Sequence, residues 1–187
     1  MDVNELLAQR GLTVADLPEP LVKLSYFQET ISEPENYVDG FSIYFADPAL
    51  NGYSTDTDFA GAFLSFATAN GSGSSYALWD DGTGKAMDDW PVIVFGDEGG
   101  VHVVAENVLG LLHLLSYDCE ISVDWDEAYF YKDDDDFEPS EDIDGYLDWI
   151  RGDYGLDPIE DPAELIARAQ ARYKASFDGW SAPYLPQ

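Results

Sequence analysis

The side chains in this sequence that could do chemistry are mostly carboxylates. Asp and Glu number 38, against 8 Lys and Arg, 2 His and 1 Cys. They are densest between residues 117 and 161, where 18 acidic residues stand against Lys132 and Arg151. Within this segment the run Asp133–Asp136 could gather a divalent cation, because Ca²⁺ and Mg²⁺ prefer oxygen ligands. Four adjacent carboxylates are, however, more typical of a solvated loop.

Local spacing marks neither a calcium loop nor a catalytic nucleophile. An EF-hand alignment that starts at Ser140 puts Arg151 where the bidentate Glu belongs. Cys119 and His113 are six residues apart, and His102 alternates with valines, so a thiol nucleophile and its base would depend wholly on the fold. Structural roles are favoured for all three side chains. We therefore predict no catalytic residue, no metal site and no cofactor.

The composition limits the classes of protein that remain. The chain has 187 residues, 45% of them hydrophobic, which suffices for one domain with a buried core. The formal net charge of −30 excludes binding to nucleic acid phosphates and disfavours anionic membrane surfaces. No stretch approaches the ~20 apolar residues of a membrane span, and the first residues lack a signal-peptide pattern. With a single cysteine and no disulfide framework, we expect a soluble, cytoplasmic protein.

Short apolar segments between glycine-rich turns predict the sheet that must position these side chains. Strands are expected at 41–45, 62–66, 76–79, 91–95 and 101–104. The short turns between the later strands are typical of an antiparallel meander. Residues 105–116 change to helical spacing, whereas residues 48–60 are polar, rich in turn residues and predicted to be a loop. The expected fold class is α+β, a mostly antiparallel sheet with helices packed on it.

Further helices are predicted at both ends of the chain. Helical patterns occur at the amino end, within 14–29 and at 142–151. The helix at 162–177 has the strongest signal, because Asp161 is a good N-cap and Pro162 suits the first helical position. We interpret residues 1–187 as a single domain with a core at about 20–118. The acidic segment at about 117–161 is an extension of that core, and the terminal helix follows it.

The stretch from Phe63 to Asp118 resembles the SMI1/KNR4 (SUKH) superfamily. The resemblance is carried by a Gly-Ser-Gly turn, a strand ending in Leu-Trp, a Pro-Val-Ile-Val strand followed by Glu-Gly, and a Val-Ala-Glu-Asn entry to an apolar helix. It covers under a third of the chain and does not extend to the acidic segment. The positions that match, all read as structural, are Gly71, Gly73, Trp79, Pro91, Phe95, Glu98, Gly99 and Asn107.

The resemblance implies a non-enzymatic binding protein. Bacterial members of the superfamily are commonly immunity proteins that neutralise toxins of contact-dependent or polymorphic toxin systems, often nucleases. Fungal relatives are regulators, so an adaptor with an endogenous partner is the alternative, and a carboxylate-based metal-binding protein is a weaker one. The superfamily has no established catalytic residues, so none are transferred to this chain.

The acidity independently suits capture of a basic protein, because a dense negative face accelerates association with a cationic partner. Aromatic side chains rimmed by carboxylates suit an interface with Arg and Lys. The opposing interpretation is that the tyrosines lie in a half-buried strand and that the carboxylates only confer solubility. The residues predicted to bind the partner are Tyr129, Tyr131, Asp133, Asp134, Asp135, Asp136, Glu138 and Glu141.

Overall fold

The computed structural model describes residues 3–45, 52–133 and 137–185. Its helices are α1 (Val3–Gln9), α2 (Glu19–Thr30), α3 (Thr57–Gly61), α4 (Val108–Leu115), α5 (Ile143–Tyr154) and α6 (Pro162–Ser181). Its strands are β1 (Ser42–Ile43), β2 (Phe63–Thr68), β3 (Ser75–Trp79), β4 (Val92–Phe95), β5 (Val101–Ala105), β6 (Ile121–Val123) and β7 (Ala128–Phe130). Short 3₁₀ turns lie at η1 (Val14–Asp16) and η3 (Met87–Asp89).

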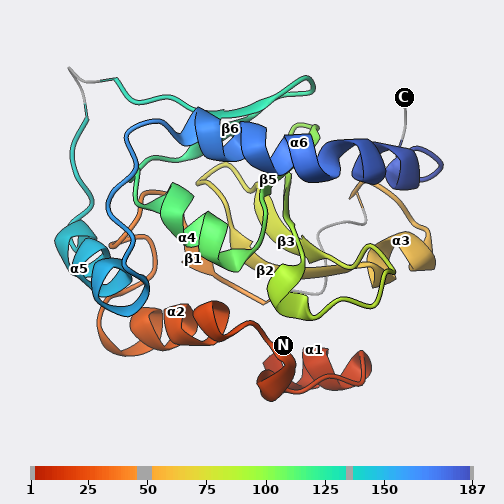
Figure 1. Ribbon diagram of the computed structural model, residues 1–187, viewed down its shortest axis with the longest axis horizontal. Coiled ribbons are helices and arrows are strands. Elements are labelled where there is room, and N and C mark those ends of the chain that lie inside the picture. Colours follow the sequence, from red (N-terminus) through yellow and green to blue (C-terminus); the bar gives the residue numbers. More distant parts are fainter. Residues whose placement is uncertain (1–2, 46–51, 134–136, 186–187) are drawn as a thin grey trace.

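The predicted antiparallel meander and the α+β fold are confirmed. Strands β1 to β5 form one antiparallel sheet in chain order, and β6 pairs with β7 in a separate hairpin. Figure 1 shows the helices around this sheet, with α6 running beside β5 and α2 and α4 on another side. Within the part of the chain that the structure describes, no helix is long and apolar enough to cross a membrane.

Both faces of the sheet are covered. Along β3, Tyr76 and Leu78 belong to the larger apolar cluster, whereas Ala77 and Trp79 belong to a smaller one on the opposite face. The larger cluster contains the apolar sides of α2, α4 and α5, and the smaller one is closed by α6 and by Phe59 of α3. Burial on both faces explains why these strands are almost continuously apolar in sequence.

The acidic segment folds onto the larger cluster. Ile121 of β6, Ala128 of β7 and Ile150 of α5 are buried within it. Tyr146 of α5 is also fully buried, and its hydroxyl donates a hydrogen bond to the backbone carbonyl of Leu112 in α4 at 2.8 Å. Several apolar residues of the segment are thus core residues, and its described carboxylates lie mostly at the surface.

The segment from 52 to 61 differs from the sequence-based expectation. Residues 57–61, predicted to be part of a loop, form α3, because the Asp56 side chain accepts hydrogen bonds from the backbone N–H groups of Asp58 and Phe59 at 2.8 and 3.3 Å. A helix of five residues is too short to produce a recognisable helical period. The predicted strand at 41–45 is likewise reduced to the two paired residues of β1.

The C-terminal helix follows its predicted start and extends past its predicted end. The Asp161 side chain accepts a hydrogen bond from the backbone N–H of Ala163 at 3.0 Å, and Pro162 occupies the first position of α6. The helix continues to Ser181 because Phe177 and Trp180 pack on the smaller cluster, where Trp180 stacks on Phe59 with ring centroids 5.7 Å apart.

Candidate functional site

The three side chains considered for nucleophilic catalysis each form a hydrogen bond to a different backbone carbonyl. His102 of β5 donates through Nε2 to the Asp124 carbonyl at 2.7 Å, and His113 of α4 bonds the Asp157 carbonyl at 2.9 Å. The Cys119 thiol donates to the Tyr131 carbonyl, and partial burial raises its pKa, so the reactive thiolate is disfavoured. No hydrogen bond joins any two of these three side chains in the described structure.

The acidic run was also considered for divalent cations. Asp134, Asp135 and Asp136 lie outside the described residues, so the structure places only Asp133 of this run, at the surface. Among the residues that are described, no group of three or more His, Cys, Asp and Glu side chains is arranged to hold a metal ion.

The remaining predicted partner residues lie on or after the β6–β7 hairpin, and all of them are exposed. Tyr129 on β7 is 38% exposed and Tyr131 just beyond it is 68% exposed. Glu138 and Glu141 are exposed in the segment that leads to α5. Tyr129 also lines a cavity of about 320 Å³ between β7 and the first turns of α6. The alternation of buried and exposed side chains agrees with a half-buried strand, because Ala128 and Phe130 pack on the larger cluster while Tyr129 and Tyr131 are exposed.

The turn of this hairpin carries a feature that sequence analysis missed. Asp124, Trp125, Asp126 and Glu127 join β6 to β7, and the turn is closed by a hydrogen bond from the Asp124 N–H to the Glu127 carbonyl at 2.9 Å. All four residues are exposed, and the Trp125 side chain is 70% exposed. A tryptophan within an otherwise acidic turn was the available signal, because no apolar period requires it in the core.

Three glycines in the β4–β5 turn, Gly96, Gly99 and Gly100, pack closely against this hairpin. A Cβ atom on Gly99 would lie 2.4 Å from Cζ2 of Trp125, so the indole packs directly on the Gly99 backbone. A Cβ on Gly100 would lie 2.1 Å from the Asp124 carbonyl oxygen, and one on Gly96 would meet Val123. Gly99 and Gly100 also have positive φ angles of 118° and 85°, which favour glycine. The glycine-rich turn is therefore a socket for the hairpin.

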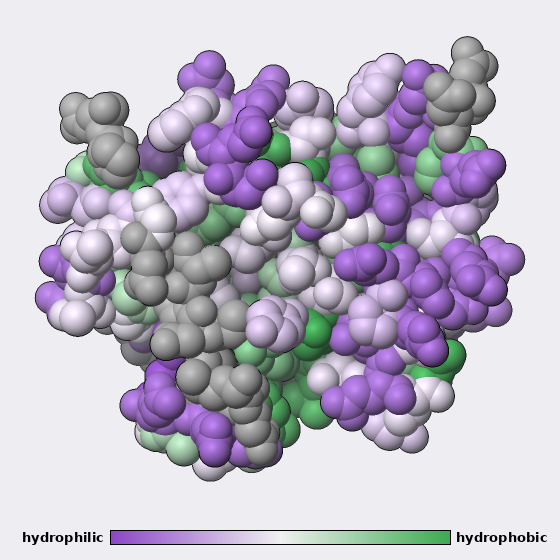
Figure 2. Space-filling view, turned by 180° about the vertical axis from the view of Figure 1, so that it is seen from behind, coloured by the Kyte–Doolittle hydropathy of each residue, from purple (hydrophilic) through white to green (hydrophobic). Residues whose placement is uncertain are grey.

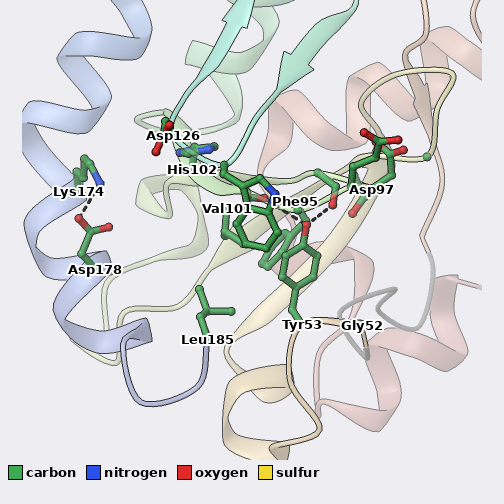
Figure 3. A pocket seen from close by; sticks show the side chains of 17 residues that line it. Gly52, Tyr53, Phe95, Asp97, Val101, His102, Asp126, Lys174, Asp178 and Leu185 are labelled. Carbon is green, nitrogen blue, oxygen red and sulfur yellow. Dashed lines mark hydrogen bonds and ion pairs between the residues drawn. The ribbon is translucent and has the colours of Figure 1, made fainter. Parts of the chain in front are cut away.

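A cavity of about 800 Å³ opens where the socket, the hairpin turn and α6 meet. Figure 3 shows Asp126 and His102 on one side of it, Asp97 on another, Lys174 and Asp178 on α6, and Tyr53 and Leu185 below. Trp125 and Glu98 also line it. Its volume lies within the roughly 300–1,000 Å³ range typical of ligand sites.

Tyr53 fixes the floor of the cavity. Its hydroxyl donates to the carbonyls of Gly96 and Gly100, which ties the loop before α3 to both ends of the socket. Its ring meets Phe95 edge-on, with centroids 5.2 Å apart. Burial, together with the nearby Asp97 carboxylate, raises the pKa of Tyr53 to about 12, so the hydroxyl remains protonated.

The cavity wall is negative at neutral pH. Hydrogen bonds from the hydroxyls of Ser72 and Ser74, at 2.8 and 2.9 Å, hold the pKa of Asp97 below its usual value, so this carboxylate remains ionised. Asp178 pairs with Lys174 at 2.7 Å. Figure 2 shows how widely hydrophilic side chains are spread over one face of the molecule, with more apolar residues between them.

The residues that resemble the superfamily pattern serve the fold and this cavity. Trp79 is buried, and the Asn107 side chain caps α4 by accepting the Gly110 N–H at 2.9 Å. The carbonyl of Pro91 accepts the N–H of Trp79, and the N–H of Gly71 donates to Glu120. The four that line the cavity are Gly73, Phe95, Glu98 and Gly99.

No protein-family model, curated protein or solved structure matches this chain.

Proposed function

We propose that this chain is a non-catalytic immunity-type protein that binds a basic protein toxin and neutralises it. The observation that supports this most directly is the β6–β7 hairpin, which presents three exposed aromatic side chains, those of Trp125, Tyr129 and Tyr131. Aromatic residues that are exposed beside carboxylates are the typical anchors of a protein interface with a cationic partner.

The charge of the chain supports a basic partner in particular. A net charge of −30 on 187 residues raises the rate of encounter with a cationic protein, by roughly 10–10³-fold at low salt. The same charge repels nucleic acids and acidic proteins, and so contributes to specificity. The resemblance to the SMI1/KNR4 (SUKH) superfamily fits both an immunity protein and an adaptor, and the neighbouring gene distinguishes the two.

The test starts from the neighbouring genes, because an immunity gene usually lies beside that of its toxin. The neighbouring product is expressed with and without this chain, and we expect growth arrest that co-expression relieves. The purified pair then gives association and dissociation rates at low and physiological salt. A partner that is a housekeeping protein, with no toxicity to relieve, contradicts the immunity role and favours the adaptor.

The same kinetics test the predicted acidic surface. Replacing Asp133, Glu138 and Glu141 by Asn, Gln and Gln removes three exposed charges from the segment that follows Tyr131 and should lower the association rate about three- to tenfold. A control variant removes the same charge elsewhere, at the exposed residues Glu5, Glu29 and Asp58. Equal association rates for the two variants would show that net charge, and not this surface, attracts the partner.

A further inference from the structure

The cavity beside the hairpin turn contains carboxylates that the protein itself does not neutralise. Of the residues that line it, Lys174 is the one Lys or Arg, and it is paired with Asp178. Asp97, Glu98 and Asp126 form no ion pair within the described structure. A cation supplied from outside would therefore find three uncompensated carboxylates around one cavity.

The basic residues of the chain are committed elsewhere. Lys23, Lys85, Arg151, Arg168, Arg172 and Lys174 form ion pairs with carboxylates at 2.7–3.4 Å. Lys132 donates to the Tyr117 carbonyl and lies over the Phe137 ring, 3.7 Å from its centroid. Arg10 bonds the carbonyls of Ala60 and Gly61. These are all eight Lys and Arg residues of the sequence, and in the structure Lys174 is the one that lines the cavity.

The aromatic side of the cavity is preorganised for a planar cation. The Trp125 ring is held against the Gly99 backbone while 70% of the residue remains exposed, so the indole offers an open surface at the cavity mouth. Cations bind over the face of an aromatic ring, and tryptophan is the most favourable of the aromatic residues. A guanidinium both stacks on such a ring and makes paired hydrogen bonds to carboxylates, which an ammonium does less well.

We propose that this cavity receives an arginine side chain of the protein partner, whose guanidinium lies over Trp125 and is attracted by the carboxylates of Asp97 and Asp126 on either side of the cavity. The inference rests on the proposed function, because it assigns a subsite to that partner. A side chain from a macromolecule is favoured over a free small cation because Trp125 belongs to the same hairpin that presents Tyr129 and Tyr131. The cavity and the exposed tyrosines are thus connected by one hairpin, which one partner could contact along its length.

The first experiment needs no partner. The full chain, labelled with ¹⁵N, is titrated with N-acetyl-arginine amide while the indole N–H signals are observed by NMR, and the Trp125 signal is assigned by its loss in Trp125→Phe. We expect a saturable shift of this signal at millimolar probe. The neutral isostere N-acetyl-citrulline amide should cause none. An equal shift with the citrulline probe, or no shift with the arginine probe, overturns the proposal.

Charge variants locate the site within the cavity. Asp97→Asn and Asp126→Asn preserve side-chain size, and each should lower the affinity for the arginine probe about three- to fivefold. Asp144→Asn, at an exposed position on α5 outside the cavity, is the matched control and should change nothing. Equal probe affinity in all three variants and the wild type contradicts the assignment of the carboxylates.

The second experiment uses the toxin identified by co-expression. Trp125→Ala should weaken its binding roughly thirtyfold, as expected for a central aromatic anchor. Tyr26→Ala is the control, because Tyr26 is similarly exposed but lies on α2. A toxin that binds Trp125→Ala as tightly as the wild type overturns the arginine subsite and leaves the proposed function intact. Failure of the neighbouring gene product to bind at all overturns both.

Discussion

Gly100→Ala should show how firmly the β6–β7 hairpin is seated on the β4–β5 turn. The new Cβ would lie 2.1 Å from the Asp124 carbonyl oxygen and 3.1 Å from Nε2 of His102. Because the first of these atoms belongs to the backbone, a side-chain rotation cannot relieve the contact. The hairpin would have to move away, which would also break the 2.7 Å hydrogen bond between His102 and Asp124.

The cost of this substitution has separable parts. Placing alanine at a φ of 85° costs about 1–2 kcal/mol, and forcing an extra carbon into a packed contact costs typically 1–3 kcal/mol. We therefore expect a loss of about 2–5 kcal/mol in the free energy of unfolding. For a chain of this length that corresponds to a fall in Tm of roughly 4–20 °C. Thermal and urea unfolding of the purified variant would measure it.

Gly11→Ala is the matched control. Gly11 has a similar φ of 69°, but a Cβ built on it meets no atom within 4 Å, so only the backbone strain of about 1–2 kcal/mol remains. The difference between the two variants isolates the contact with Asp124. If Gly100→Ala is as stable as Gly11→Ala, the hairpin is not seated on this turn, and the cavity that depends on the contact is wrongly described.

Three further changes test other parts of the structure. Tyr146→Phe removes the hydroxyl that bonds the Leu112 carbonyl in the core and should cost about 1–2 kcal/mol in urea unfolding, whereas an unchanged midpoint would mean that this bond contributes nothing. Partial burial, with the neighbouring carboxylates Glu120 and Asp118, raises the pKa of Asp39 above 3.8. At pH values above this raised pKa, ionised Asp39 therefore lowers the free energy of unfolding, and this loss disappears as the pH falls towards 3.8. Asp39→Asn should accordingly raise Tm at pH 7 and have little effect on Tm near pH 3.8. An equal rise in Tm at both pH values would show that the ionisation of Asp39 is not the cause. Finally, added NaCl should raise Tm of the wild type, because salt screens the self-repulsion of a chain with net charge −30, and a fall in Tm would point to ion pairs as the dominant electrostatic contribution.

Sequence patterns predicted the elements whose signals are local. The cap at Asp161 and Pro162 defined the start of α6, and Asn107 stands where the predicted entry to α4 was placed. The glycine-rich turns separated strands that pair with their neighbours in chain order, so short-range information was sufficient for the meander. The helix α3 was not predicted because its five residues are too few to show a helical period and Phe59 is its buried residue.

The candidate site could be predicted only in part. Tyr129 and Tyr131 were predicted to bind the partner from an aromatic segment beside carboxylates; the structure shows that both are exposed, and their role stays a prediction. Trp125 was missed because its importance comes from contact with Gly99, and nothing near either residue in sequence indicates that they meet. The cavity likewise depends on Tyr53 and on α6, which are brought together only by the packing of the smaller cluster.

The placement of α6 has a consequence for synthesis of the chain. The aromatic residues Phe63, Trp79 and Phe95 form one face of the sheet, and they are covered by a helix that is translated much later. At roughly 5–20 residues per second, this face stays uncovered on the ribosome for several seconds after β4 has emerged. Nascent chains therefore pass through a stage in which an aromatic sheet face is open to other proteins. A fragment that stops before residue 162 should therefore bind chaperones and aggregate through this open sheet face.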